Sequence, residues 1–233
     1  MYIELPQYLL EDGSYLGQIA VTQPRRVAAT SLANRVSAEQ GQVLGTLVGY
    51  SVRFDERVSP GTRIKYLTDG MLVREMMSDP FLTRYDVVIV DEAHERTLRT
   101  DVVLASLKQV LAIRNGDGTD KKGKGKAKPL KVVIMSATLD AEKFSKFFEK
   151  YIFCYSPFLI TESLNSAPVL YVKGRQHPVS ILHTSTSQND YAEAALRTFF
   201  QIHVDRPPGD VLIFLPGILE LSTFLFTLNF NCI

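Results

Sequence analysis

Tyr85 to Arg96 read Y-D-V-V-I-V-D-E-A-H-E-R, and this stretch predicts the architecture of the chain more directly than any other. Its first half contains a continuous β-branched run, Val87 to Val90, which is typical of a strand buried on both faces of a parallel sheet. Two adjacent carboxylates, Asp91 and Glu92, follow directly. Because ligands of open α/β sheets bind beyond the carboxyl ends of the strands, both acids are predicted at a ligand-binding edge.

Paired acids at such an edge suit a magnesium–nucleotide site. One carboxylate holds the metal, usually through water, and its neighbour orients the attacking water. The alternative is that the acids are only the first charges of the next helix, where they favour the helix dipole. The sequence favours the nucleotide site, because D-E-A-H follows a buried strand directly. A second apolar run, Val132 to Met135, also ends in a polar tripeptide, S-A-T at residues 136–138.

Bulk composition is that of an ordinary globular protein, with 233 residues, 45% hydrophobic content and a net charge of +1. A nucleic-acid site must therefore be local, because no global basic field is present. Cys154 and Cys232 have no metal-ligand spacing, which predicts an intracellular protein without a disulfide-linked partner. No signal peptide is expected at the amino terminus. No membrane span is expected either, because Pro216-Gly217 splits the apolar segment that runs from 211 to 233.

Strand and helix patterns alternate along the chain, which predicts a parallel α/β sheet with right-handed crossovers. A helix starting near Met71 has Thr68 or Asp69 as its predicted cap. The predicted helices cover residues 5–11, 27–40, 71–77, 99–113, 140–148 and 190–204. The predicted strands cover residues 19–22, 47–52, 64–67, 87–90, 130–135, 169–172, 179–183 and 211–215.

The motifs taken together resemble those of the DEAH-box RNA helicases of superfamily 2. The resemblance covers roughly residues 5–148 and 167–217, and it depends on Thr22–Ala29, Thr68–Leu72, Asp91–Arg96, Ser136–Asp140, Gly174–Pro178 and Val211–Gly217. It implies an α/β fold with RecA-like parallel sheets and flanking helices. Residues 1–172 would form the first RecA-like domain. Residues 173–233 would begin the second and carry an atypical apolar tail from about 218.

The same resemblance implies a role for each site residue. ATP and Mg²⁺ would bind at Asp91 and Glu92, and His94 would link this catalytic site to the second domain. The partners implied are single-stranded RNA or RNA–protein complexes and an activating protein cofactor, in the nucleus or nucleolus. Ser136 and Thr138 would couple hydrolysis to domain movement, and the RNA path would be lined by Thr22, Arg25, Arg26, Thr68 and Asp69.

Two of these roles have alternatives in the residues themselves. Strand-end loops that present hydroxyls and arginines suit phosphate oxygens of any base sequence. Arg25 and Arg26 could instead begin a helix for solubility, although arginine near a helix N-terminus opposes the dipole. Ser136 and Thr138 could simply cap the following helix.

The chain also departs from the family pattern. Members carry a glycine-rich phosphate loop before the helix that starts here at Leu5, whereas this chain has Met1-Tyr-Ile-Glu4 and no first strand there. Residues 151–166 look like an insertion, and the apolar tail replaces a polar helix start. We therefore expect a fragment or an imperfect gene model of an ATP-dependent RNA helicase that is inactive alone.

Two other function classes stay open. One is a non-catalytic RNA-binding or regulatory fragment, which RNA-stimulated ATPase activity would exclude. The other is a DNA translocase of the same superfamily, which competition between RNA and DNA oligonucleotides would detect. A metal-dependent hydrolase without nucleotide is disfavoured, because Asp91, Glu92 and His94 lie too close in sequence to converge on one ion.

Overall fold

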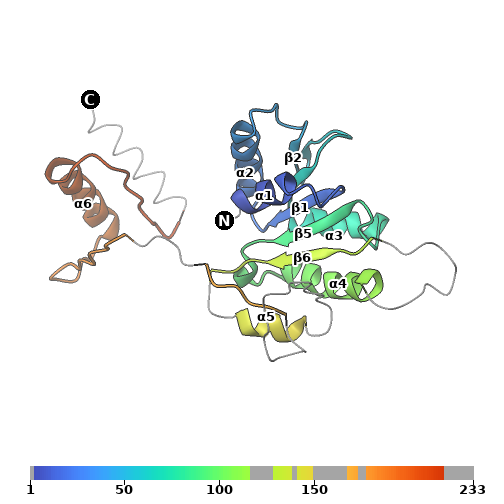
Figure 1. Cartoon of the computed structure of the whole chain (residues 1–233). Coiled ribbons are helices and arrows are strands. Elements are labelled where there is room, and N and C mark those ends of the chain that lie inside the picture. The colour runs from blue at the N-terminus through green and yellow to red at the C-terminus, as the bar shows by residue number, and fades with distance from the viewer. Residues whose placement is uncertain (1–2, 116–127, 138–140, 149–166, 173–176, 218–233) are drawn as a thin grey trace. The chain divides into compact units, whose positions relative to one another are not determined.

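The computed structural model describes residues 3–115, 128–137, 141–148, 167–172 and 177–217 of the 233. It divides into two compact units, residues 1–172 and 173–233. The first unit contains a six-stranded sheet with the order β3-β2-β4-β1-β5-β6 (Figure 1). Its strands are β1 (Gln18–Gln23), β2 (Val48–Val52), β3 (Asp55–Arg57), β4 (Ile64–Thr68), β5 (Tyr85–Val90) and β6 (Lys131–Ile134).

All neighbouring strands of this sheet pair in parallel except β2 and β3, which form an antiparallel hairpin at one end. The carboxyl ends of β1, β4, β5 and β6 therefore meet at one edge. Among the described residues of this unit are the helices α1 (Glu4–Glu11), α2 (Arg26–Glu39), α3 (Asp69–Ser78), α4 (Leu98–Asn115) and α5 (Ala141–Phe147). A short 3₁₀ helix, η1 (Ala93–Glu95), lies between β5 and α4.

Helices cover both faces of the sheet (Figure 1). Val88 and Val90 of β5 pack in a core with residues of α3 and α4, whereas Val87 and Ile89 pack in a second core with residues of α1 and α2. All four valine and isoleucine side chains are 0% exposed. Successive residues of a strand face opposite sides, so a strand covered on both sides needs the unbroken apolar run seen here. The predicted α/β sheet with flanking helices is confirmed, and its order is consistent with a RecA-like fold.

The strands predicted at 19–22, 47–52, 64–67, 87–90 and 130–135 and the six predicted helices are all present, with small shifts at their ends. Thr68 occupies the N-cap position of α3, but its side chain makes no capping hydrogen bond. The three-residue strand β3 was not predicted. It is short and polar, so it lacks the apolar alternation that identifies a strand.

Three predicted strands are wrong: residues 169–172, 179–183 and 211–215 have no regular structure. A strand needs a neighbour for its backbone hydrogen bonds, and the described residues offer these segments none. Their apolar side chains are accordingly exposed, as for Leu170 at 79%, Val179 at 82% and Phe214 at 86%. In the second unit the helix α6 (Tyr191–Asp205) forms as predicted, with the Asp190 carboxylate accepting hydrogen bonds from the amides of Ala192 and Glu193.

Several predictions fall outside the described residues: Thr138, the segment 151–166, residues 174–176 and the tail 218–233. The identification of residues 173–233 as the start of a second RecA-like domain stays a prediction. Within the part of the chain that the structure describes, no helix combines the length and apolar character needed to cross a membrane.

Candidate functional site

Asp91 follows β5 directly and lies at the carboxyl edge of the sheet, as predicted. It is 4% exposed, and its amide donates a hydrogen bond of 3.3 Å to the carbonyl of Thr22 at the end of neighbouring β1. One carboxylate oxygen accepts from the side-chain amide of Gln23, and the other accepts from the amide of Glu92 at 2.9 Å. Burial raises the pKa of Asp91, and these two hydrogen bonds oppose that shift. The carboxylate is thus fixed in orientation before any ligand binds.

The donor set at this edge fits Mg²⁺ better than a metal with an all-protein cage. Among the described residues no cluster of three or more His, Cys, Asp or Glu side chains could hold an ion. Mg²⁺ needs only one or two carboxylates when nucleotide phosphates and water complete its shell. Asp91 and Glu92 are the side chains that could supply them.

Glu92 and Arg96 flank a tightly wound turn. Both have positive φ, +53° and +47°, a left-handed conformation that non-glycine residues rarely adopt. Between them the amide of Ala93 donates to the carbonyl of Met135 at 3.1 Å, which joins the turn to the end of β6. The turn is therefore held against the strand that precedes S-A-T.

His94 bridges the two motifs. Its Nε2 atom lies 3.4 Å from the Oε2 atom of Glu92, and its Nδ1 atom accepts a hydrogen bond of 3.3 Å from the amide of Ala137. The structure thus brings Asp91, Glu92 and His94 together with the S-A-T turn, in which Ser136 is described. Thr138, the other predicted coupling residue, lies outside the described residues.

The predicted RNA-binding residues do not all reach the surface. Thr22 is 0% exposed, and its hydroxyl has no hydrogen-bond partner among the described residues. It meets the site through its carbonyl, which accepts from Asp91. Arg25 and Arg26, at the start of α2, are exposed, with side-chain exposures of 75% and 58%.

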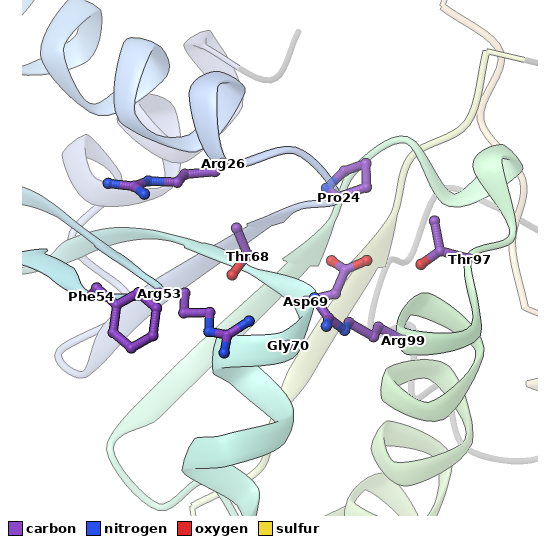
Figure 2. A pocket seen from close by; sticks show the side chains of 9 residues that line it. All are labelled: Pro24, Arg26, Arg53, Phe54, Thr68, Asp69, Gly70, Thr97 and Arg99. Carbon is purple, nitrogen blue, oxygen red and sulfur yellow. The ribbon is translucent and has the colours of Figure 1, made fainter.

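A depression of about 320 Å³ is lined in part by Arg26 (Figure 2). Thr68 and Asp69, which begin α3, form part of its wall together with Arg26. Four side chains that the sequence reasoning missed also line it: Arg53, Phe54, Thr97 and Arg99. Arg99 lies in the first turn of α4, where a cation opposes the helix dipole, so the sequence marks its charge as unusual but does not predict its proximity to α3. Arg53 and Phe54 lie in the turn between β2 and β3, and the sequence did not predict this hairpin because β3 is short and polar.

Phe54 is 90% exposed and has a φ of +67°. The guanidinium of Arg53 lies 4.7 Å from the centre of its ring. Exposed aromatic rings paired with cations are typical of surfaces on which nucleic-acid bases stack.

Asp69 supports the wall of this depression and does not present its carboxylate to solvent. It is 2% exposed; its Oδ2 atom accepts a hydrogen bond of 2.6 Å from the hydroxyl of Thr100. Its Oδ1 atom is buried without a partner in the described residues. The charge presented to solvent comes instead from the arginines, and the N-terminus of α3 adds a positive dipole end. The depression therefore favours an anionic ligand such as a phosphate.

Comparison with known proteins gives relatives that cover nearly the whole of this chain. Human ATP-dependent RNA helicase DHX33 is 51% identical over 94% of the chain. A Caenorhabditis elegans probable ATP-dependent RNA helicase DHX35 homolog is 42% identical over 92% of it. The Arabidopsis thaliana pre-mRNA-splicing factor ATP-dependent RNA helicase DEAH10 is 41% identical over 94% of it. The chain spans 28%, 27% and 33% of the lengths of these relatives, respectively. No protein-family model matches the chain.

Proposed function

Because this chain belongs to the DEAH-box family of ATP-dependent RNA helicases over the segment that it shares with them, we propose that its first unit binds Mg²⁺–ATP and single-stranded RNA. In the whole protein this unit would couple ATP hydrolysis to movement along RNA or to unwinding. The observation that supports the proposal best is the meeting of three features at one sheet edge: Asp91, the His94 bridge to Ala137, and the arginine-lined depression.

On the nucleotide side, Asp91 and Glu92 would hold the magnesium ion, which neutralises phosphate charge when bound. Glu92 would also orient the attacking water and take up its proton. His94 keeps the Glu92 carboxylate and the S-A-T turn in a fixed relation, because its two ring nitrogens contact one each. Ser136 and Thr138 would then transmit the state of the nucleotide to the rest of the protein.

On the RNA side, Arg25, Arg26, Arg53 and Arg99 would contact phosphate oxygens, and Phe54 would stack on a base. Thr68 and Asp69 would shape the N-terminus of α3, where the helix dipole favours a phosphate. Thr22 would act indirectly, because its side chain is buried and its carbonyl accepts from the amide of Asp91. Such contacts recognise the backbone and do not read base sequence. RNA–protein complexes in the nucleus or nucleolus, with an activating protein cofactor, are the proposed setting.

Two binding measurements on the purified chain test the proposal. Calorimetry with ATP and Mg²⁺ should show binding that Asp91→Asn weakens and Asp205→Asn, a change at an exposed residue of α6, does not. Fluorescence anisotropy with a short single-stranded oligouridylate should show binding that DNA of matched sequence competes with poorly. RNA binding without nucleotide binding would indicate the non-catalytic alternative, equal competition by DNA would indicate a DNA translocase, and loss of both activities would refute the proposal.

A further inference from the structure

Two side chains connect the loop after β1 to the D-E-A-H-E-R turn. Gln23 donates to the carboxylate of Asp91. Arg25, two residues later, donates to the Oε1 atom of Glu95 from Nη2 at 2.9 Å and from Nε at 3.2 Å. The proposed RNA-binding arginine is therefore already paired with an acid of the turn that carries the proposed nucleotide site.

The Arg25–Glu95 pair has the properties of a contact that can be exchanged. The side chain of Arg25 is 75% exposed and that of Glu95 is 26% exposed. Ion pairs at this degree of exposure contribute little to stability and are screened by salt. A phosphate oxygen offers a guanidinium the same charge-assisted geometry as a carboxylate. Little free energy is lost when one replaces the other.

The Arg25–Glu95 pair joins the proposed RNA site to the turn that begins at Asp91, so replacing Glu95 by a phosphate would affect both. Arg25 is the N-cap residue of α2 and has extended backbone geometry, and its neighbour Arg26 lines the depression proposed for RNA. Glu95 ends the turn that begins at Asp91. A strand of RNA that reaches Arg25 must compete with Glu95, and Gln23 of the same loop contacts Asp91.

We propose that Glu95 is an internal, reversible competitor for Arg25, which RNA displaces when its phosphate takes the guanidinium. RNA binding thereby removes one of the side-chain contacts of the D-E-A-H-E-R turn, while Gln23 still contacts Asp91 and Arg96 still pairs with Asp101. This inference rests on the proposed function, because it assigns a partner-exchange step to the same RNA site. It makes Glu95 a positioning residue and gives the RNA surface a contact with the turn that carries the nucleotide site.

The Glu95→Gln variant distinguishes a competitor of RNA from a residue that only holds Arg25 in place, because the two roles predict opposite changes in RNA affinity. If Glu95 competes with RNA, then Glu95→Gln must strengthen RNA binding, because it removes the competitor. If Glu95 only holds Arg25 in position for RNA, the same variant must weaken binding. A matched control is Glu39→Gln, which removes the same charge from a carboxylate that pairs with exposed Arg35 at 2.6 Å and is itself 31% exposed.

The experiment measures the affinity of the purified chain for short single-stranded oligouridylate by anisotropy, across a salt series. Glu95→Gln is expected to tighten binding by up to about fivefold, the upper range for an exposed ion pair. Glu39→Gln should tighten it less, through net charge alone. Arg25→Gln should weaken binding and reduce the steepness of the salt dependence. Adding Glu95→Gln to Arg25→Gln should then change no more than Glu39→Gln does, because the competed residue is gone.

Three outcomes would overturn the inference: Glu95→Gln weakens binding, it matches Glu39→Gln, or it acts equally with and without Arg25. In each of these the wild-type chain still binds RNA, so the proposed function stands. Absence of RNA binding by the wild type and by every variant would overturn the proposed function and this inference together.

Discussion

The Nδ1 atom of His94 accepts a hydrogen bond of 3.3 Å from the backbone amide of Ala137. Because an accepting nitrogen carries no proton, the ring proton lies on Nε2, which faces Glu92 Oε2 at 3.4 Å. One imidazole thus fixes two strand-end turns that lie 43 residues apart in sequence. A movement of the Glu92 carboxylate would therefore change the position of His94 and, through it, that of the S-A-T turn.

Loss of this imidazole should release the Ala137 amide. In His94→Ala we expect faster hydrogen exchange at Ala137, with a stability loss of no more than about 1 kcal/mol, because the contact lies near solvent. Exchange measured by NMR would show this directly, with His183→Ala, at an exposed residue of the second unit, as the control. Equal protection of Ala137 in His94→Ala and wild type would contradict the bridging role.

A buried hydroxyl relay ties the start of α4 to the start of α3. Thr100 donates to Asp69 at 2.6 Å, so its only hydroxyl proton is used, and Thr97 must donate in the 2.7 Å contact between the two threonine hydroxyls. Thr100→Val keeps the shape but leaves the Asp69 carboxylate without a hydrogen-bond donor among the residues that the structure describes. We expect a loss of about 2 kcal/mol in the free energy of unfolding, as for a buried hydrogen bond to a charged group.

Urea denaturation measures this loss, and Thr100→Ser is the matched control because it retains the hydroxyl. The serine variant should recover most of the stability. A valine variant as stable as the serine variant would show that the relay contributes nothing.

The guanidinium of Arg114, at the end of α4, is 3% exposed and donates to four backbone carbonyls. Phe81 and Leu82 lie in the loop before β5, Tyr85 is the first residue of β5, and Lys128 lies shortly before β6. Arg114→Leu removes all four hydrogen bonds, although the carbonyl of Leu82 still accepts from the amide of Tyr85, so we expect a loss of about 3 kcal/mol in unfolding free energy. Urea denaturation should show no comparable loss for Arg74→Leu, at an exposed position of α3. Equal losses at the two positions would refute the role of Arg114.

The strands of the sheet could be predicted because the apolar pattern of each strand matches the burial of its two faces. Val87 to Val90 are apolar without a break since both faces are covered, and this pattern is readable without a structure. The same reading failed at 169–172, 179–183 and 211–215. An apolar run shows a preference for burial, but it does not show whether a neighbouring strand is present to pair with it.

Candidate site residues could be predicted only where a side chain of suitable chemistry directly follows a predicted strand. Asp91, Glu92 and His94 stand directly after a strand, so their place at the sheet edge followed from the pattern. Thr22 also lies near a strand end, yet its side chain turns into the core. Arg99 comes from a helix start 31 residues after Thr68, and only tertiary packing brings the two together. The periodicity of a sequence does not predict which way one side chain points, nor which residues far apart in the chain lie close together.

Asp101 provides a test of pH dependence. Arg96 donates to its two carboxylate oxygens at 2.7 and 3.0 Å, and these hydrogen bonds lower the pKa of Asp101. A lowered pKa means that the stabilisation is present above the unfolded-state value, about 3.9, and is lost as the pH falls through the folded-state value. Since Arg96 and Asp101 side chains are 56% and 41% exposed, solvent screening limits the contribution to about 0.5 kcal/mol.

Asp101→Asn should therefore be slightly less stable than wild type at neutral pH and equally stable in acid. Urea midpoints at several pH values measure this, with Asp205→Asn as the exposed control. A stability difference that stays constant down to acid pH would show that the carboxylate charge is not its cause.

Arg99 tests whether the depression in Figure 2 binds the nucleic-acid backbone. Each phosphate contact on single-stranded nucleic acid contributes about 0.7 to the slope of log affinity against log salt, because it releases condensed counterions. Arg99→Gln should therefore weaken binding of oligouridylate and reduce the magnitude of that slope by about 0.7. Arg74→Gln makes the same charge change on α3, at an exposed residue outside the lining of the depression, so its slope should match that of the wild type. If both variants shift the slope equally, the effect of Arg99 is one of overall charge, and the depression is not the phosphate site.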